Sequence, residues 1–250
     1  MSAQAVYVLW LRDMKWFLRA RSRIISMIVM PFLWLAIIGM GLGAVTSIPG
    51  GGRYIDFLAP GIVGMAILFG ATMSGISVLW DKQFGFMKEI LVAPVSRISI
   101  VLGKTFGGTT TSIIQGLLLL LVAGLIGAKM PGFAGFLLVL LFMIILALGF
   151  VSLGLAIASR IGDPIAFPLV VNFLIMPLFF TSGAIFPLST APGWLWSIAY
   201  INPVTYGVDG LRGSILGVSE FPLWLDFAVL TIFSLAMILL GAYLFKKMKA

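Results

Sequence analysis

Long apolar runs separated by short polar segments dominate this chain. Six runs each exceed 20 residues and almost lack charged side chains: residues 24–45, 57–79, 105–127, 135–158, 165–187 and 224–245. About 20 apolar residues let a helix cross the hydrocarbon core of a bilayer. Their apolarity is continuous rather than alternating, which favours helices over the strands of a membrane barrel. The pattern predicts an all-α polytopic membrane protein with six transmembrane helices, in one transmembrane domain over residues 1–250.

Composition agrees with this prediction and narrows the chemistry. Hydrophobic residues make up 61% of the 250, against roughly half in soluble domains. Cysteine and histidine are absent, which removes disulfides, thiolate metal sites and the commonest proton shuttle. Within the six runs only Asp226 is charged, near one end, whereas proton-coupled carriers usually place a titratable group at mid-membrane. We therefore expect no enzyme, no catalytic residue, no metal and no cofactor bound by this chain.

The distribution of basic residues predicts the orientation. If the first segment is cytoplasmic, thirteen of the sixteen lysines and arginines fall on that side and only Arg53, Lys129 and Arg212 fall outside. Cytoplasmic loops carry such an excess. The sequence predicts a multi-pass protein of the cell (inner or plasma) membrane with both termini cytoplasmic. Because topology and the lipid bilayer explain the net charge of +8, we expect no nucleic-acid partner.

The segment before the first run has a helical amphipathic pattern. Val6, Leu9, Trp10, Met14 and Phe17 recur near helical spacing, with basic residues between them. The pattern predicts an interfacial helix over residues 1–23 on the cytoplasmic surface. A basic anchor with no further role is the alternative.

Residues 183–217 are too apolar for a free loop, yet prolines and glycines interrupt them. A seventh span would place the C-terminal lysines outside, against the charge rule. We therefore predict a re-entrant hairpin on the outer side, which lipid tolerates only where protein buries it. Asp209 and Arg212 are spaced to pair on one helix face, which suggests a role in stability. The polar residues of this outer hairpin are Asn202, Tyr206, Asp209 and Arg212.

The cytoplasmic loop over residues 80–98 is the most informative. Phe84, Met87 and Leu91 lie at i, i+3 and i+7, which predicts a short helix with one apolar face, and Pro94 disfavours helix at the residue before it. Such a face suits docking into a groove on a partner protein. The alternative is that these side chains only dip into lipid.

Two stretches carry a family resemblance: WDKQFGFMKEILVAPVSRISIVLGK at residues 80–104 and SGAIFPLSTAPGWLWSIAYINPVTYGVDGLRG at 182–213. The first resembles the coupling-helix region of type-2 ABC exporter permeases, and the second is similar to the region after their fifth span, above all in daunorubicin-resistance-type and nodulation-type permeases. One departure is Gln83, where relatives often carry an acid before the Phe-Gly pair.

The resemblance implies a membrane subunit that works with two copies of an ATP-binding ABC subunit, which would bind the ATP and magnesium. It also implies pairing with a second copy of this permease or a close homologue. The residues it assigns to ATPase coupling are Phe84, Gly85, Met87, Lys88, Glu89, Leu91, Pro94 and Arg97.

The expected function is outward transport of a hydrophobic drug, lipid or lipid-linked glycan. Polar residues inside the spans are candidates for the substrate pathway, although such residues often bond a helix backbone instead: Ser74, Ser77, Asn172, Thr181 and Ser182. The only P-loop-like triplet includes Lys104 but lacks a glycine at Ile98, so we interpret Lys104 as a cytoplasmic anchor. The alternative functions are an ATPase-independent channel or an intramembrane enzyme.

Overall fold

The structure is a computed structural model that describes residues 3–43, 52–92 and 95–247. Every regular element in these residues is helical, in agreement with the predicted all-α class. In chain order the elements are α1 (Ala3–Arg19), α2 (Arg21–Gly43), α3 (Tyr54–Met73), α4 (Ile76–Gln83), α5 (Phe86–Val92), α6 (Arg97–Leu125), α7 (Phe133–Ala158), α8 (Ala166–Phe180), the 3₁₀ turn η1 (Leu188–Thr190), α9 (Gly193–Ile201), α10 (Pro203–Leu216) and α11 (Leu223–Lys246).

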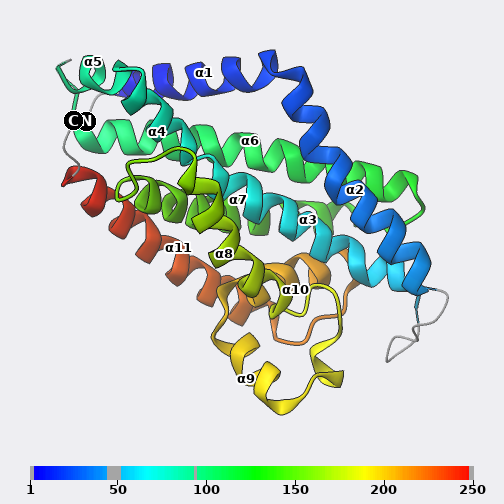
Figure 1. Cartoon of the computed structure of the whole chain (residues 1–250). Coiled ribbons are helices and arrows are strands. Elements are labelled where there is room, and N and C mark those ends of the chain that lie inside the picture. Colours follow the sequence, from blue (N-terminus) through cyan, green and yellow to red (C-terminus); the bar gives the residue numbers. More distant parts are fainter. Residues whose placement is uncertain (1–2, 44–51, 93–94, 248–250) are drawn as a thin grey trace.

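Helices α3 and α7 form the centre of a bundle (Figure 1). Helix α3 packs against α2, α6, α7 and α10, and α7 packs against α11 and α6. Both central helices are apolar almost all round, as expected for helices with neighbours on most sides. The outer helices α2, α8 and α11 expose large apolar side chains, such as Ile37, Phe173 and Leu239. A helix whose outer face is this apolar is suited to lipid.

The predicted second span is broken into two helices. Helix α3 ends at Met73 and α4 begins at Ile76, after a turn at Ser74 and Gly75. The turn lies where the chain meets α7 most closely. A Cβ at Gly75 would collide with the backbone of Gly154, and a Cβ at Gly154 would collide with the carbonyl of Thr72. Glycine lets the two backbones touch here, as small residues do between membrane helices.

Four helical stretches in the described residues are long and apolar enough to cross a membrane: Tyr54–Gln83, Arg97–Leu125, Phe133–Ala158 and Leu223–Lys246. The predicted first and fifth spans correspond to shorter apolar helices, Ile25–Gly41 within α2 and Ala166–Phe180. Each of the six predicted runs therefore contains a helix. Helix α8, with 15 residues, is shorter than a span needs, whereas α2 has 23 residues over its full bounds.

The fifth predicted span, residues 165–187, is wrong in length. Helix α8 stops at Phe180 after 15 residues, about 22 Å at the usual rise per residue. The side chain of Ser182 donates to the carbonyl of Phe179 at 2.7 Å, and Gly183 then takes φ +73°, a left-handed conformation that ends the helix. The apolar sequence continues to Pro187, but the helix ends at Phe180.

Helix α1 is amphipathic as predicted, and part of its apolar face packs on protein. Leu9, Met14 and Phe17 are buried, and a Cβ at Gly103 of α6 would meet Leu9 at 2.8 Å. Trp10 Nε1 donates to Thr110 Oγ1 of the same helix at 3.0 Å. Contacts advance together along both chains, so α1 runs beside α6 in the same direction, as Figure 1 shows. The apolar stripe marked a helix–helix contact.

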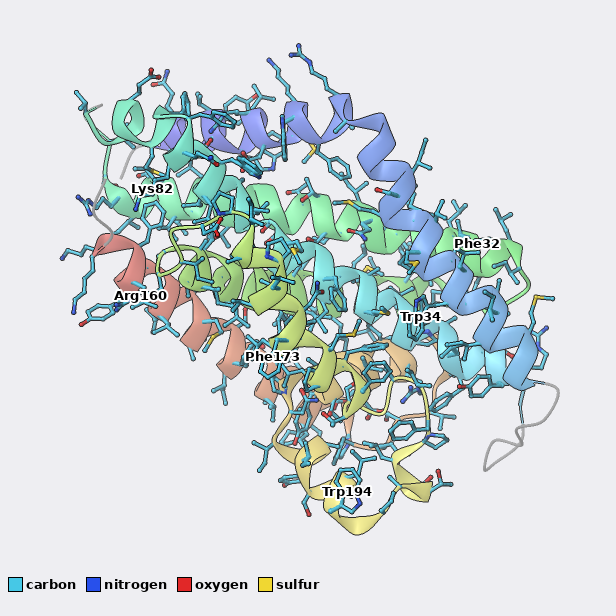
Figure 2. All side chains as sticks on the ribbon, in the orientation of Figure 1. Phe32, Trp34, Lys82, Arg160, Phe173 and Trp194 are labelled. Atoms are coloured by element: carbon cyan, nitrogen blue, oxygen red, sulfur yellow. The ribbon has the colours of Figure 1, made fainter. Side chains whose placement is uncertain are left out.

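The predicted hairpin, residues 183–217, contains two helices after η1. Helix α9 carries exposed aromatic side chains, including Trp194. Helix α10 is buried along almost its whole length, between α3, α7 and α11. In Figure 2, Trp194 lies at the end of the molecule opposite to Lys82 and Arg160. This separation agrees with a basic end and an aromatic end, as the charge pattern requires.

Candidate functional site

The loop predicted to couple to an ATPase lies at one end of the bundle, between α4 and α6 (Figure 1). Helix α4 ends at Gln83, Phe84 follows as its C-cap, and Gly85 adopts φ +79°. Such a φ is easily reached by glycine and costs other residues energy. Gly85 thereby turns the chain into α5, which begins at Phe86. The Phe-Gly pair is thus the hinge of the loop.

The single apolar face predicted from Phe84, Met87 and Leu91 is wrong in two respects. Phe84 precedes α5 and belongs to the end of α4. Met87 is 1% exposed and is part of the main hydrophobic core, so it holds α5 on the bundle instead of facing a partner. The three-residue spacing suggested one face, but the turn at Gly85 separates the two residues.

Phe84 is the prominent exposed side chain of this loop. It is 77% exposed and stacks on Trp80, one turn earlier, with ring centroids 5.7 Å apart. Glu89 is exposed on α5. The side chains of Lys88 and Leu91, and the whole of Pro94, lie outside the described residues. A stacked aromatic pair at an exposed turn is rigid and large, as interface anchors usually are.

Arg97, at the C-terminal end of the loop, bonds to helix α11. Its Nη1 donates to the backbone carbonyl of Lys246 at 2.6 Å, which joins the start of α6 to the last turn of α11. The last carbonyls of a helix lack partners within the helix, so a cation there satisfies one of them. The loop is therefore anchored at Met87 and at Arg97, with Phe84 exposed before them.

A buried ion network links α1, α4 and α6 beside this loop. Lys104 Nζ lies 2.8 Å from Asp81 Oδ2 and 3.2 Å from Asp13 Oδ1. Arg12 forms two hydrogen bonds with the Asp81 carboxylate, and its guanidinium lies 4.0 Å above the ring of Phe86. The network thus reaches from α1 to the first residue of α5.

The structure corrects the interpretation of Lys104 as a cytoplasmic anchor. Its side chain is 2% exposed and is surrounded by Asp13, Asp81 and the hydroxyl of Ser77, 3.3 Å away. A buried ammonium needs such partners, because its loss of hydration otherwise costs several kcal/mol. Burial raises the pKa of the Asp13 carboxyl, and Lys104 opposes that rise. Burial lowers the pKa of Arg12, but its hydrogen bond to Asp81 and the charge of that carboxylate outweigh this and raise it.

Sequence reasoning missed this network. Its members are distant in the sequence, and each stood in a segment where the charge rule already explained a polar residue. The available signal was that Lys104 directly precedes the predicted third span, residues 105–127, and lies seven residues after the start of the helix that carries it. Its burial follows from the contact between α1 and the start of α6, where Leu9 meets Gly103 and Asp13 meets Gly107.

The predicted substrate-pathway residues do not form one group. Ser74, Thr181 and Ser182 donate to carbonyls of their own helices, as polar residues of membrane helices often do. Asn172 is exposed on α8. Ser77 accepts from Lys104.

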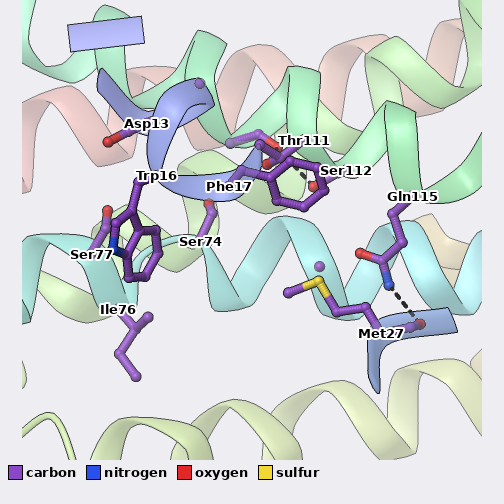
Figure 3. A pocket seen from close by; sticks show the side chains of 13 residues that line it. Asp13, Trp16, Phe17, Met27, Ser74, Ile76, Ser77, Thr111, Ser112 and Gln115 are labelled. Atoms are coloured by element: carbon purple, nitrogen blue, oxygen red, sulfur yellow. Dashed lines mark hydrogen bonds between the residues drawn. The ribbon is translucent and has the colours of Figure 1, made fainter. Parts of the chain in front are cut away.

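Ser74 and Ser77 also line a small cavity between α1, α2, α3, α4 and α6 (Figure 3). Its volume is about 40 Å³, which holds water but lies far below the roughly 300 Å³ of a drug-sized site. Figure 3 shows Gln115 bridging to the carbonyl of Met27 across it, at 3.3 Å. This cavity does not accommodate a transported molecule within one subunit.

The residues of the outer hairpin hold its helices together. Asn202 accepts from Val204 N at the start of α10 and donates to the carbonyl of Leu178 at 2.6 Å. The Tyr206 hydroxyl donates to the carbonyl of Tyr200 at 2.6 Å. These contacts fix the turn between α9 and α10.

Asp209 and Arg212 pair as the spacing predicted, 3.9 Å apart. Asp209 also accepts from the backbone N–H groups of Glu220 and Phe221. Arg212 donates to the carbonyl of Gly183 at 2.9 Å and lies 3.8 Å above the Phe57 ring. The pair thus connects α10 to α3 and to both ends of the hairpin.

No group of three or more acidic side chains in the described ranges gathers as a metal site would require. The chain also lacks the complete P-loop pattern. The distinctive features of the described residues are an exposed loop, its ion network and a set of apolar helices.

Comparison with known proteins identifies the family of this chain. Residues 4–216 match the model of the family described as ABC-2 type transporter. The chain is 30% identical to the putative transport permease ycf38 of Cyanophora paradoxa over 76% of this chain and 66% of that protein. It is 25% identical to the inner membrane transport permease YadH of Escherichia coli K12, over 94% of this chain and 92% of the relative. It is also 25% identical to nodulation protein J of Rhizobium leguminosarum bv. viciae, over 95% and 92%.

The family match covers α1 to α10 and includes the Phe84 loop, the ion network and the outer hairpin. ABC-2 permeases are membrane subunits of ABC transporters, and they normally work with an ATP-binding subunit. The long apolar helices agree with a multi-pass membrane protein. This chain belongs to the ABC-2 type transporter family and is a transmembrane permease of an ABC transporter.

Proposed function

We propose that this permease exports a hydrophobic drug, lipid or lipid-linked glycan from the cytoplasmic side, driven by a separate ATPase. Two permease chains, identical or closely related, would pair above two ATPase subunits, which carry the ATP and magnesium. The apolar outer faces of α2, α8 and α11 support a bilayer setting for such a pair. The cavity lined by Ser74 and Ser77 is too small for these substrates, and we place the pathway between the two permease chains.

The proposed location is the inner or plasma membrane, with both termini cytoplasmic and six spans. The basic end of the molecule supports this orientation, since Lys82 and Arg160 lie on the same end in Figure 2. The relative YadH is named as an inner membrane permease. Helix α2, with 23 residues, is long enough for a span, and the short helix α8 would complete the six spans by tilting little or by locally thinning the bilayer.

One observation carries the proposed coupling to the ATPase. Phe84 stands exposed on a turn that is followed by two fixed points, Met87 in the core and Arg97 on the end of α11. A push on Phe84 would therefore move α4, α5 and the start of α6 together. Trp80 stacks on the Phe84 ring and supports it. We assign Phe84 the role of the contact with the ATPase and Met87 the role of holding α5.

The test replaces Phe84 by Asp in the permease co-expressed with its ATPase subunit. An aspartate would have to enter the partner's apolar groove unpaired, so we expect the complex to weaken at least a hundredfold, measured by pull-down in detergent. Glu89→Ala should change binding less than tenfold, because an exposed rim charge contributes about 1 kcal/mol or less.

The matched control is Phe133→Asp. Phe133 is 81% exposed and starts α7, at the other end of the bundle. It introduces the same charge and should leave ATPase binding intact. Full ATPase binding and full ATPase stimulation by Phe84→Asp would show that this loop is not the coupling element.

A further inference from the structure

A second, larger hollow opens between α1 and the end of α4. Its volume is about 740 Å³, within the range of sites that bind small organic molecules. The side chains that line it come from α1, α4 and α6, together with the exposed Phe84: Val8, Leu11, Arg12, Asp13, Lys15, Trp16, Arg19, Ser77, Trp80, Asp81, Phe84 and Lys104. Neither the export reaction nor the ion network accounts for its size.

The charges around the hollow are unbalanced. Lys104 and Arg12 are neutralised by Asp13 and Asp81 in the ion network. Lys15 and Arg19 are exposed on the same side of α1, one turn apart, and neither forms a salt bridge with the residues that the structure describes. A lysine and an arginine at i and i+4 repel each other, and an anionic group bound between them removes that repulsion.

The remaining wall is apolar and aromatic. Trp16 and Phe84 are more than half exposed, and Trp80 lies behind Phe84 in a stacked pair. Val8 adds an aliphatic side chain on α1. A ligand that satisfies both parts of the wall has a negative head and a hydrocarbon body.

We propose that this hollow binds one anionic phospholipid, with its phosphate at Lys15 and Arg19 and an acyl chain along Val8, Trp16 and Trp80. Basic pockets between membrane helices on the cytoplasmic side bind acidic headgroups, and anionic lipids are enriched in that leaflet. Placing the lipid in that leaflet rests on the proposed orientation of the permease. A bound lipid would brace α1 against α4 and lie directly beside the loop proposed for coupling.

The test uses the full-length permease purified alone in detergent, without any ATPase. Native mass spectrometry counts lipids retained during titration with dioleoyl phosphatidylglycerol, dioleoyl phosphatidylcholine or free glycerol phosphate. We expect one phosphatidylglycerol per chain, at least tenfold tighter than phosphatidylcholine, and no retained glycerol phosphate. Because α1 carries both basic residues at its surface, the double substitution Lys15→Ala with Arg19→Ala should fold normally and bind phosphatidylglycerol at least tenfold more weakly.

Lys82→Ala with Arg160→Ala is the matched control. It removes the same charge from exposed positions at the same end of the molecule, and neither residue lines the hollow. Phosphatidylglycerol retention should be unchanged in this control. Trp16→Ala should weaken phosphatidylglycerol binding while leaving the preference for it over phosphatidylcholine intact, since the headgroup contacts remain.

Three results would overturn the proposal. Equal retention of the two lipids would remove the role of charge, and retention of glycerol phosphate as tight as that of the lipid would make the hollow a site for free phosphate. If the Lys15, Arg19 double variant keeps its lipid but loses the ATPase in a separate pull-down, the hollow receives the partner protein instead. Loss of ATPase binding in Phe84→Asp with normal lipid retention tests the coupling proposal alone, so the two proposals fail separately.

Discussion

Replacing Lys104 by Met tests whether the buried ion network holds α1 on the bundle. Methionine fills a similar volume without charge, so the substitution leaves no large cavity. Asp81 keeps both hydrogen bonds from Arg12, but Asp13 loses the one cation that the structure places within salt-bridge distance of it. The substitution therefore leaves the mostly buried Asp13 carboxylate without its ion-pair partner.

The magnitude follows from that geometry. Removing one partner of a buried ion pair costs about 3–5 kcal/mol. The Asp13 side chain is 17% exposed, and Asp81 stays paired with Arg12. We therefore expect the free energy of unfolding to fall by about 3 kcal/mol, the lower end of that range. That corresponds to roughly a hundredfold change in the unfolding equilibrium, at about 1.4 kcal/mol per factor of ten. Adding Asp13→Asn to Lys104→Met should recover part of this loss, because a neutral amide is cheaper to bury.

Equilibrium unfolding in mixed micelles, followed by tryptophan fluorescence, measures this free energy. The control is Lys82→Met, which removes an exposed lysine from the same end and should cost below about 0.5 kcal/mol. Trp10 and Trp16 on α1 report its release from α6. If Lys104→Met is no more destabilised than Lys82→Met, or if Asp13→Asn makes it worse, the network does not stabilise the packing of α1.

Three further predictions follow from the fold. Gly154→Val should destabilise the fold by about 3 kcal/mol or more, because a side chain there meets the carbonyl of Thr72. Folded yield in size-exclusion chromatography measures the effect, and the control is Gly162→Ala, where the added methyl group has open space around it. Asn202→Ala should cost about 1–2 kcal/mol in mixed-micelle unfolding, because α10 loses its N-cap and the bond to Leu178, whereas Ser197→Ala should cost less. Reporters fused after Ala250 or within the loop at Gly162 should read cytoplasmic, and reporters at Gly51 or Lys129 external; an external C-terminus would contradict the six-span arrangement.

The candidate site was only partly predictable from the sequence. The loop was recognisable, since Phe84 and Gly85 stand in a motif, but the turn at Gly85 was missed because one helical face was predicted across it. The burial of Met87 was not, because a three-residue spacing is the same whether its face contacts a partner or the protein's own core. In the sequence, Lys15 and Arg19 could be interpreted only as positive-inside charges. The structure shows that they line the hollow between α1 and α4.

The sequence by itself determined the all-helical class, the six apolar runs and the family motifs. These depend on hydrophobic length, charge placement and residue order, which are local properties of the chain. The α3–α4 break and the early end of α8 depend on contacts: Gly75 against Gly154, and Ser182 bonded back to Phe179 before the left-handed Gly183. The ion network and the hollow beside it were decided only by the packing of α1 along α6, because burial of a charge becomes tolerable only when distant residues supply its partners.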